Sequence, residues 1–293
     1  MSKYTNKLSF YARSSEPAKV PIPQGLSGDC WLHQGPGNAW NAMHRHPELE
    51  LNLVVRGTAT YLLPDKRYDA RRGSLLWLFP DQDHLLLAQS DDLEMWIAVF
   101  PQSIILQSCD SDPAHPMLSA LPDGYFLKQL SEAAFQRLAG HMACLGREKD
   151  NRLVFNSGIG YLLMLAWEGF HETGADPCPA NLHPAVEVAM REIAAEIEAQ
   201  SVAQIAAQAS VSVSRLSHLF KEQTGLSISE FRNLRRLERF MRAYDSNKSL
   251  TLTHAAFEAG FGSYVQFHRV FKQLVGVSPR ELAGNAKRAN GGG

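Results

Sequence analysis

One pattern of small, turn-forming and apolar residues occurs twice in the last third of the chain, and no other feature restricts the fold as strongly. The first copy begins IAAQASVS at 205–212 and the second begins AAFEAGFG at 255–262. The offset is 50 residues between Ala206 and Ala256, and it has grown to 51 where Phe220 matches Phe271. Such a repeat predicts two similar structural units, with one extra residue at the start of the later helix of the second copy.

Each part of the repeat has a mechanical role in a pair of crossing helices. A small alanine in the first helix allows close crossing, and a sharp turn follows at 210–211 in the first copy and at 260–261 in the second. Ser212 and Ser263 are suited to cap the helix after the turn. Apolar residues then recur at spacings of three and four, which buries one helix face and exposes the other. The repeat therefore predicts two helix-turn-helix units.

The exposed face of each second helix carries side chains that suit DNA. We expect contacts with double-stranded DNA from Ser214, Arg215, Ser217, His218, Lys221, Tyr264, Val265, His268, Arg269 and Lys272. Arginine can donate two hydrogen bonds to a guanine edge, whereas lysine is better suited to a phosphate. The alternative is that these are only solvated polar faces, but a doubled unit with two positive faces favours DNA binding.

The segment 229–244 between the two units is predicted to be an amphipathic connector helix, because five arginines alternate there with apolar residues. A rigid connector could hold two recognition helices about 34 Å apart, so that they enter successive major grooves. Charge agrees with this assignment. Residues 1–180 hold 15 basic and 20 acidic side chains, a net charge of −5, whereas residues 181–293 hold 14 and 10, a net charge of +4.

Residues 201–282 resemble the DNA-binding domain of the AraC/XylS family of bacterial transcription regulators. The resemblance includes the connector segment LRRLE at 234–238 and the closing segment at 260–279, with Ser210 and His254-Ala255 as small departures. It implies a sequence-specific transcription regulator, most commonly an activator, and a homodimer formed through helices of the N-terminal domain. RNA polymerase is a candidate partner of such a regulator.

The N-terminal part is predicted to be an all-β barrel followed by helices. Short apolar or β-branched runs separated by turn residues predict strands at 50–55, 59–63, 74–79, 85–88 and 95–100. Helical spacing follows at 131–145 and 153–170. We therefore predict an effector-binding and dimerisation domain at 1–170, a proline-containing linker at 171–184, an all-α DNA-binding domain at 185–284 and a disordered tail at 285–293.

Four residues of the predicted barrel could surround one point. His44, His46 and Glu50 share a strand face if 44–50 is extended, and His84 would enter from a neighbouring strand. Three imidazoles and a carboxylate suit a divalent metal ion. The spacing resembles the cupin barrel, with Gln82 in place of a glycine and His84 one residue early. Metal binding, direct contact with a small-molecule effector and structural packing all stay open. Trp77 is a further candidate for effector contact by stacking.

Two other function classes each explain only part of the sequence. A metal-dependent cupin enzyme, such as an isomerase or dioxygenase, would use the histidines but leaves the helix-turn-helix repeat unexplained, and a nucleoid-type binder leaves the barrel unexplained. We therefore expect no enzymatic activity and no cofactor beyond a candidate barrel metal. The N-terminus lacks the apolar stretch of a secretory signal, no apolar run reaches about 18 residues, and four cysteines lack C-x-x-C spacing. These features predict a cytoplasmic protein without a membrane span.

Overall fold

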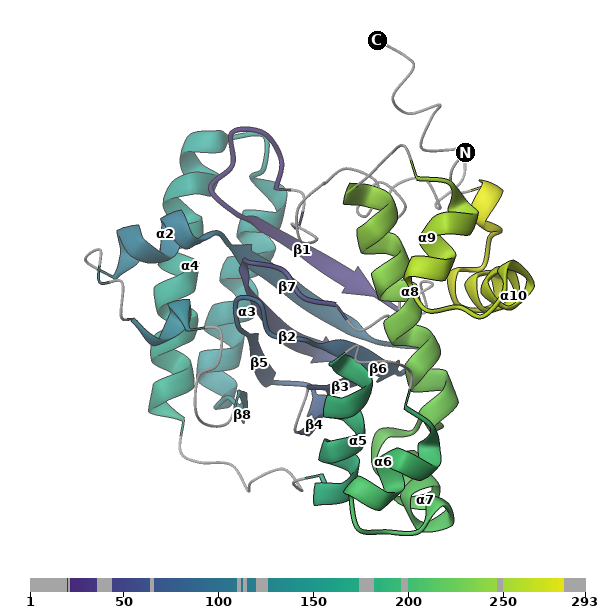
Figure 1. Ribbon diagram of the computed structural model, residues 1–293. Helices are drawn as coiled ribbons and strands as arrows, with labels where there is room; N and C mark the ends of the chain where they lie inside the picture. Colours follow the sequence, from purple (N-terminus) through teal and green to yellow (C-terminus); the bar gives the residue numbers. More distant parts are fainter. Residues whose placement is uncertain are drawn as a thin grey trace.

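The computed structural model describes residues 20, 22–35, 44–63, 66–109, 112, 115–119, 126–173, 182–195, 200–246 and 250–281. A β-rich domain is followed by helices and then by an all-helical domain (Figure 1). This order confirms the predicted fold class. The predicted tail at 285–293 and the middle of the predicted linker lie outside the described residues, and the domain boundaries stay predictions.

Two antiparallel sheets form the N-terminal domain. The larger has the order β1 (Asp29–Gln34), β7 (Glu94–Phe100), β2 (Leu49–Arg56), β5 (Ser74–Leu78) and β8 (Leu127–Gln129). The smaller has the order β4 (Arg67–Arg71), β3 (Thr58–Leu62) and β6 (Leu85–Gln89). All five predicted strands are present within two residues at either end, whereas β1, β4 and β8 were not predicted.

The two faces of the larger sheet meet different neighbours. Asn52 of β2 accepts a hydrogen bond from the Tyr61 hydroxyl of β3 at 3.3 Å, so the side of β2 that carries Asn52 faces the smaller sheet. Adjacent residues of a strand point to opposite faces. Trp77 pairs with Leu51, and its ring lies 5.8 Å from that of Trp167, so the Trp77 face is covered by helices. The interior between the sheets therefore receives Glu50 and Asn52.

Helices cover the outer face of the larger sheet. They are α2 (Gln102–Ser108), the short 3-10 helix η1 (Pro116–Leu118), α3 (Glu132–Arg147) and α4 (Arg152–Glu172). Ser131 caps α3 by accepting a hydrogen bond from the Ala134 amide. Among the described helices, α4 alone is long and apolar enough to cross a membrane, with a mean hydropathy of 1.2. Its residues Phe155, Ile159 and Leu162 are buried in the core of the domain.

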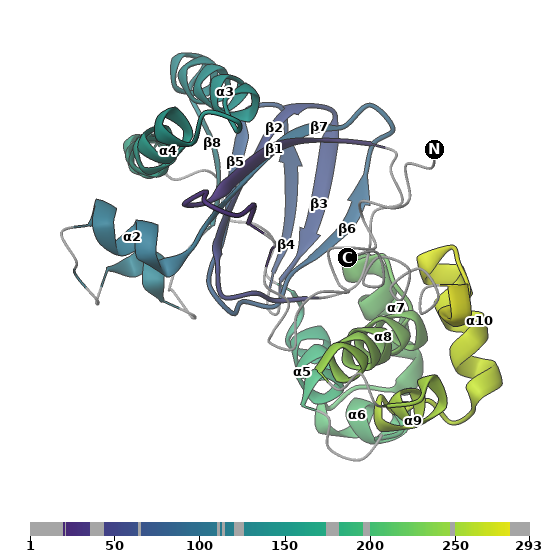
Figure 2. The same cartoon turned by 90° about the horizontal axis from the view of Figure 1, so that it is seen from above.

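Six helices form the C-terminal domain, on the opposite side of the barrel from α3 and α4 (Figure 2). They are α5 (Pro184–Ala194), α6 (Val202–Gln208), α7 (Val213–Thr224), α8 (Ile228–Ser246), α9 (Leu252–Glu258) and α10 (Tyr264–Val275). The pairs α6–α7 and α9–α10 are the two predicted helix-turn-helix units, and α8 is the predicted connector. The long α8 runs from one unit to the other (Figure 1).

The two turns have the same hydrogen bonds. The amides of Ser210 and Val211 donate to the carbonyls of Ala207 and Ala206, each at 3.0 Å, and the amides of Gly260 and Phe261 donate to the equivalent carbonyls at 2.9 and 3.1 Å. One detail of the prediction is wrong. The extra residue of the second copy is Gly262, which lies in the turn before the cap Ser263 and not in the helix.

The residue that reverses the chain in each turn has a left-handed backbone. Gly260 has a φ of 86° and Ser210 has a φ of 55°. A side chain is strained in this region, whereas glycine adopts it readily. The first unit therefore tolerates strain that the second avoids.

Candidate DNA interface and sensor site

The two predicted recognition helices, α7 and α10, are built in the same way. The side chain of Ser212 accepts a hydrogen bond from the Arg215 amide, and that of Ser263 accepts one from the Gln266 amide. Both capping predictions are confirmed. One face of each helix is fully packed, through Leu216, Leu219, Phe220, Phe267, Val270 and Phe271. Packing on that side fixes each helix and leaves its opposite side toward solvent.

All ten predicted DNA contacts lie on the outward side of these helices. In α7 all five are exposed, and in α10 three are exposed while Tyr264 and His268 are half-buried. Val265 is 78% exposed, which is unusual for a large apolar side chain near a helix start. An exposed valine beside basic residues suits the methyl group of thymine in a major groove. These contacts remain predictions; eight of the ten residues are exposed, while Tyr264 packs partly against the core of the second unit.

The connector arginines divide into different roles. Arg232 donates to the backbone carbonyl of Gln200, which holds α8 against the segment before α6. Arg235 is buried and lies 3.2 Å from Asp83 of the barrel and 3.1 Å from Glu238. Burial raises the pKa of Glu238, although Arg235 and Arg242 lower it. At least two of the five arginines therefore serve packing, not DNA.

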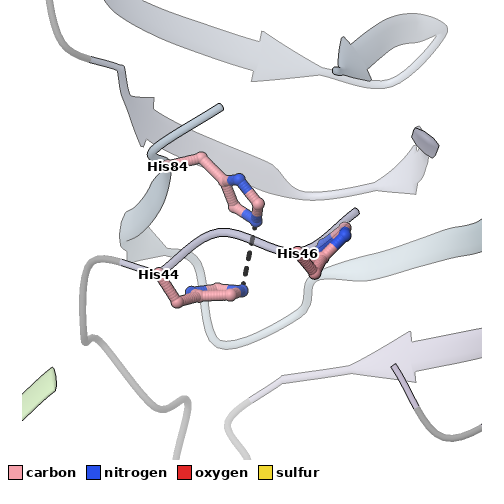
Figure 3. A group of neighbouring side chains, drawn as sticks. All are labelled: His44, His46 and His84. Atoms are coloured by element: carbon pink, nitrogen blue, oxygen red, sulfur yellow. Dashed lines mark hydrogen bonds between the residues drawn. The ribbon is translucent and has the colours of Figure 1, made fainter. Parts of the chain in front are cut away.

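Three histidines meet at one point of the barrel (Figure 3). The backbones of His44 and His84 form an isolated antiparallel bridge, with reciprocal hydrogen bonds of 3.0 and 2.9 Å. The Nε2 atoms of these two rings lie 3.1 Å apart. The ligand atoms of His44, His46 and His84 all lie within 4.8 Å of one another. The sequence-based grouping of the three histidines is therefore matched by their geometry.

The segment before β2 differs from the prediction in one respect. Residues 44–50 do not form one strand, because β2 begins at Leu49 and His44 pairs only through its bridge. The three histidine side chains converge because backbone hydrogen bonds hold this segment beside residues 81–84. The carbonyl of His46 accepts a hydrogen bond from the Asp81 amide at 2.8 Å, which anchors the segment to the turn before His84.

Glu50 supplies a buried negative charge beside the histidines. Its Oε2 lies 3.1 Å from Nε2 of His46. Burial alone would raise the pKa of Glu50, but the hydrogen bond and positive charge of His46 lower it to about 2. Conversely, burial lowers the pKa of His46 and the bond to Glu50 raises it, with a net rise. The two groups therefore form a buried ion pair, and Glu50 is ionised.

A chain of hydrogen bonds extends from Glu50 across the interior. Asn52 donates to Oε1 of Glu50 at 2.8 Å and accepts from the hydroxyl of Tyr61 at 3.3 Å. Neither Asn52 nor Tyr61 was predicted from sequence to belong to the site. The alternation of β2 places Asn52 on the face of Glu50, and a buried polar residue two positions from a carboxylate was the signal that could have found it.

Trp77 does not join this cluster. Its register places it on the outer face of the sheet, where it contacts Trp167 of α4 at a ring distance of 5.8 Å. The predicted stacking role against a ligand in the barrel is therefore not supported by its position. Residues 76 and 78 of the same strand point inward, and both are leucines.

The barrel contacts the first helix-turn-helix unit. Leu62 of β3 and Leu85 of β6 share a buried cluster with Val186 of α5 and Phe220 of α7. The ion pair between Asp83 and Arg235 lies at the edge of this contact, with side chains 18% and 10% exposed. Asp83 immediately precedes His84. The histidine cluster and the connector helix are therefore joined through two consecutive residues.

Two family models match the chain. A model described as an AraC-like ligand binding domain matches residues 32–153, and a helix-turn-helix domain model matches residues 187–285. The chain belongs to the AraC/XylS family. This AraC-family chain is similar to the arabinose operon regulatory protein of Escherichia coli (strain K12), with 24% identity over 252 residues that make up 82% of each protein.

Other proteins match most of the length of this chain. The HTH-type transcriptional activator RhaS of Klebsiella pneumoniae (strain 342) is 24% identical over 82% of this chain and 86% of its own length. Among solved structures, an apo ToxT variant from Vibrio cholerae is 14% identical, covers 87% of this chain and 96% of that chain, and has a TM-score of 0.40. The family models and these sequence relatives identify an effector-controlled transcription regulator. They favour it over the alternative of a cupin enzyme.

Proposed function

We propose that this AraC-family chain is a cytoplasmic, homodimeric activator that carries out no reaction of its own. It binds DNA through α7 and α10 and responds to a small-molecule effector held by His44, His46, Glu50 and His84. RNA polymerase is the partner that activation requires. Residues 1–170 form the effector-binding and dimerisation domain, and residues 185–284 form the DNA-binding domain.

The observation that carries the proposal is the surface of the two recognition helices. Each helix has a capped start, a fully buried inner face and an outer face of accessible polar and basic side chains. Matching positions carry matching chemistry, because Lys221 and Lys272 occupy the same place in the repeat. A basic residue at that place in each unit suits the phosphates that flank two adjacent major grooves.

The test is selection of bound sequences from a random duplex pool, followed by a salt titration of the selected site. We expect two short blocks about one helical turn apart and an affinity that falls steeply with salt. Absence of any enriched sequence would contradict the assignment of α7 and α10, and a flat salt response would contradict DNA binding itself.

Two substitutions in α7 provide a matched pair. Arg215→Ala should relax the preference at one base position and cost about 1–3 kcal/mol. Lys221→Ala should weaken binding equally on all sequences and reduce the salt slope by about 1. Both side chains are exposed, so neither change should alter folding. An equal loss on all sequences for Arg215→Ala would reassign that residue to a phosphate contact.

Dimerisation is proposed to use the outer face of α4. Four large apolar side chains of this helix are exposed: Leu153 by 79%, Val154 by 45%, Tyr161 by 56% and Met164 by 36%. An exposed apolar patch of this kind is typical of an interaction site. We expect Tyr161→Glu to shift the protein from dimer to monomer in sedimentation analysis, whereas His218→Glu on the distant α7 should not. A monomeric wild-type protein would contradict this part of the proposal.

A further inference from the structure

The three histidines present matching ligand atoms to one point. A backbone carbonyl can only accept, so the ring Nδ1–H of His46 donates to the carbonyl of Glu48 at 3.0 Å, and that of His84 donates to the carbonyl of Gln82 at 2.8 Å. Both rings are held by these bonds with Nε2 directed at the cluster. Fixing one ring nitrogen by a backbone acceptor is the arrangement that orients histidines for metal binding.

The spacing of the ligand atoms fits a single ion. Two ligands at metal distances of about 2.0–2.1 Å lie about 2.9–3.4 Å apart for bond angles between square and tetrahedral. The Nε2 atoms of His44 and His84 are 3.1 Å apart, and Nε2 of His46 is 3.1 Å from Oε2 of Glu50. The widest ligand separation among the histidines is within 4.8 Å, so only a small inward movement is needed.

The chemistry of the donors also fits. Imidazole is the ligand that suits zinc, cobalt, nickel and related ions, and the carboxylate of Glu50, whose Oε2 lies 3.1 Å from Nε2 of His46, can balance the charge of a buried dication. His46 and His84 are 1% exposed, whereas His44 is half-buried, so one of the three imidazoles is partly accessible to solvent. A cluster kept only for packing would not require three imidazoles, because apolar side chains fill such space without the cost of burying polar groups.

We infer that His44, His46 and His84 bind one divalent transition-metal ion through their Nε2 atoms, with Glu50 as the fourth ligand. His46 then releases to solvent the Nε2 proton that it donates to Glu50. In this inference the ion is the effector to which the regulator responds. The regulatory half of the inference rests on the proposed function, because it requires DNA binding. The binding half stands on the barrel alone.

The route from the ion to the DNA-binding domain is short. Asp81 has a left-handed backbone with a φ of 57°, and its amide donates a hydrogen bond to the carbonyl of His46. Two residues later Asp83 pairs with Arg235 of α8 at 3.2 Å, and His84 follows directly. A movement that draws His84 toward an ion therefore displaces Asp83 and its contact with the connector helix.

The binding half is tested by titrating the full-length protein, stripped with a chelator, with Co²⁺ and following its visible absorption. We expect one equivalent to bind the wild type, and we expect His44→Gln and His84→Gln to weaken binding by more than about 100-fold, since even outer-shell partners are worth about 10–100-fold. His33→Gln is the control, because His33 lies in the same domain but contacts Gln89 instead. Circular dichroism verifies folding of each variant. Lack of saturable binding by the wild type, or full binding by both cluster variants, overturns the inference.

The regulatory half is tested by measuring affinity for the selected DNA site with and without Co²⁺. We expect a change of at least about fivefold, the lower end of common coupling between sites. Asp83→Asn should still bind Co²⁺ but lose this response. An unchanged wild-type affinity overturns the role as a signal while the binding half stands. If no DNA sequence is selected at all, the proposed function fails, and the Co²⁺ titration still decides the metal site.

Discussion

The strained turn of the first helix-turn-helix unit predicts opposite effects for two substitutions at matching positions. Ser210 and Gly260 both reverse the chain with a positive φ, and their backbone hydrogen bonds are equivalent. Ser210→Gly should therefore stabilise the DNA-binding domain, and Gly260→Ala should destabilise it. Both changes act on the backbone alone, because neither removes a turn hydrogen bond.

The magnitude follows from two opposing terms. A left-handed backbone costs a residue with a side chain about 1–2 kcal/mol, while glycine loses about 0.5–1 kcal/mol more backbone freedom on folding. The middles of these two ranges give a net gain for Ser210→Gly of about 0.75 kcal/mol. A Cβ on Gly260 would lie 3.7 Å from the nearest atom, Nη1 of Arg239, which is ordinary contact. Gly260→Ala therefore adds no clash, and its cost should be of the same size with the opposite sign.

Urea unfolding of the full chain can separate the domains. All five tryptophans lie between residues 31 and 167, so tryptophan fluorescence follows the N-terminal domain, while circular dichroism also follows the C-terminal helices. We expect the dichroism midpoint to rise for Ser210→Gly and to fall for Gly260→Ala, with smaller shifts in fluorescence. A neutral or destabilising Ser210→Gly would refute the argument, because it would mean that the serine side chain compensates the strain.

Three further outcomes are expected. Burial raises the pKa of the Cys30 thiol to about 12, so Cys30 stays a neutral thiol at pH 8. In the folded protein Cys30 should resist iodoacetamide and the exposed Cys144 should react, as measured by mass spectrometry. Rapid labelling of Cys30 in the native protein would contradict its burial. Phe271→Ala should destabilise the second unit by about 3–5 kcal/mol in urea unfolding, because the ring is fully buried; a loss below about 1 kcal/mol would show that the site collapses easily. Ser131→Ala should cost about 1 kcal/mol through loss of the α3 cap, while Ser131→Asp should retain stability and serves as its control.

Features determined by local pattern were accessible from the sequence. Each helix-turn-helix unit is one such feature, because its caps, turn and apolar spacing all lie within a stretch of about 20 residues. The core strands β2, β5 and β7 were also predicted, since each is short and rich in apolar residues, although β2 includes Glu50 and Asn52. The edge strand β1 was missed because Cys30 alone of its six residues is buried, and β8 because it has only three residues.

Features determined by contacts across the chain were less accessible. The face of the sheet to which Trp77 belongs depends on its pairing with Leu51, and a strand that is buried on both faces has no alternation to reveal it. The histidines converge through a backbone bridge between residues 40 positions apart, not through a continuous strand. Likewise, Arg235 has the same sequence surroundings as the half-buried Arg232 and Arg236, and its contact with Asp83 of the barrel distinguishes it.

The division of the C-terminal core has a consequence for promoters. The first unit shares its buried cluster with Leu62 and Leu85 of the barrel, whereas the cluster of the second unit, from Leu237 to Val275, contains no barrel residue among those described. Within the described residues, the apolar core of the sensor domain therefore packs with the first recognition helix, α7, and not with α10. A base change in the half-site of α10 should weaken binding equally with and without the signal, while a change in the half-site of α7 should alter the size of the response. Strength and responsiveness of a promoter could thus evolve separately, each through its own half of the binding site.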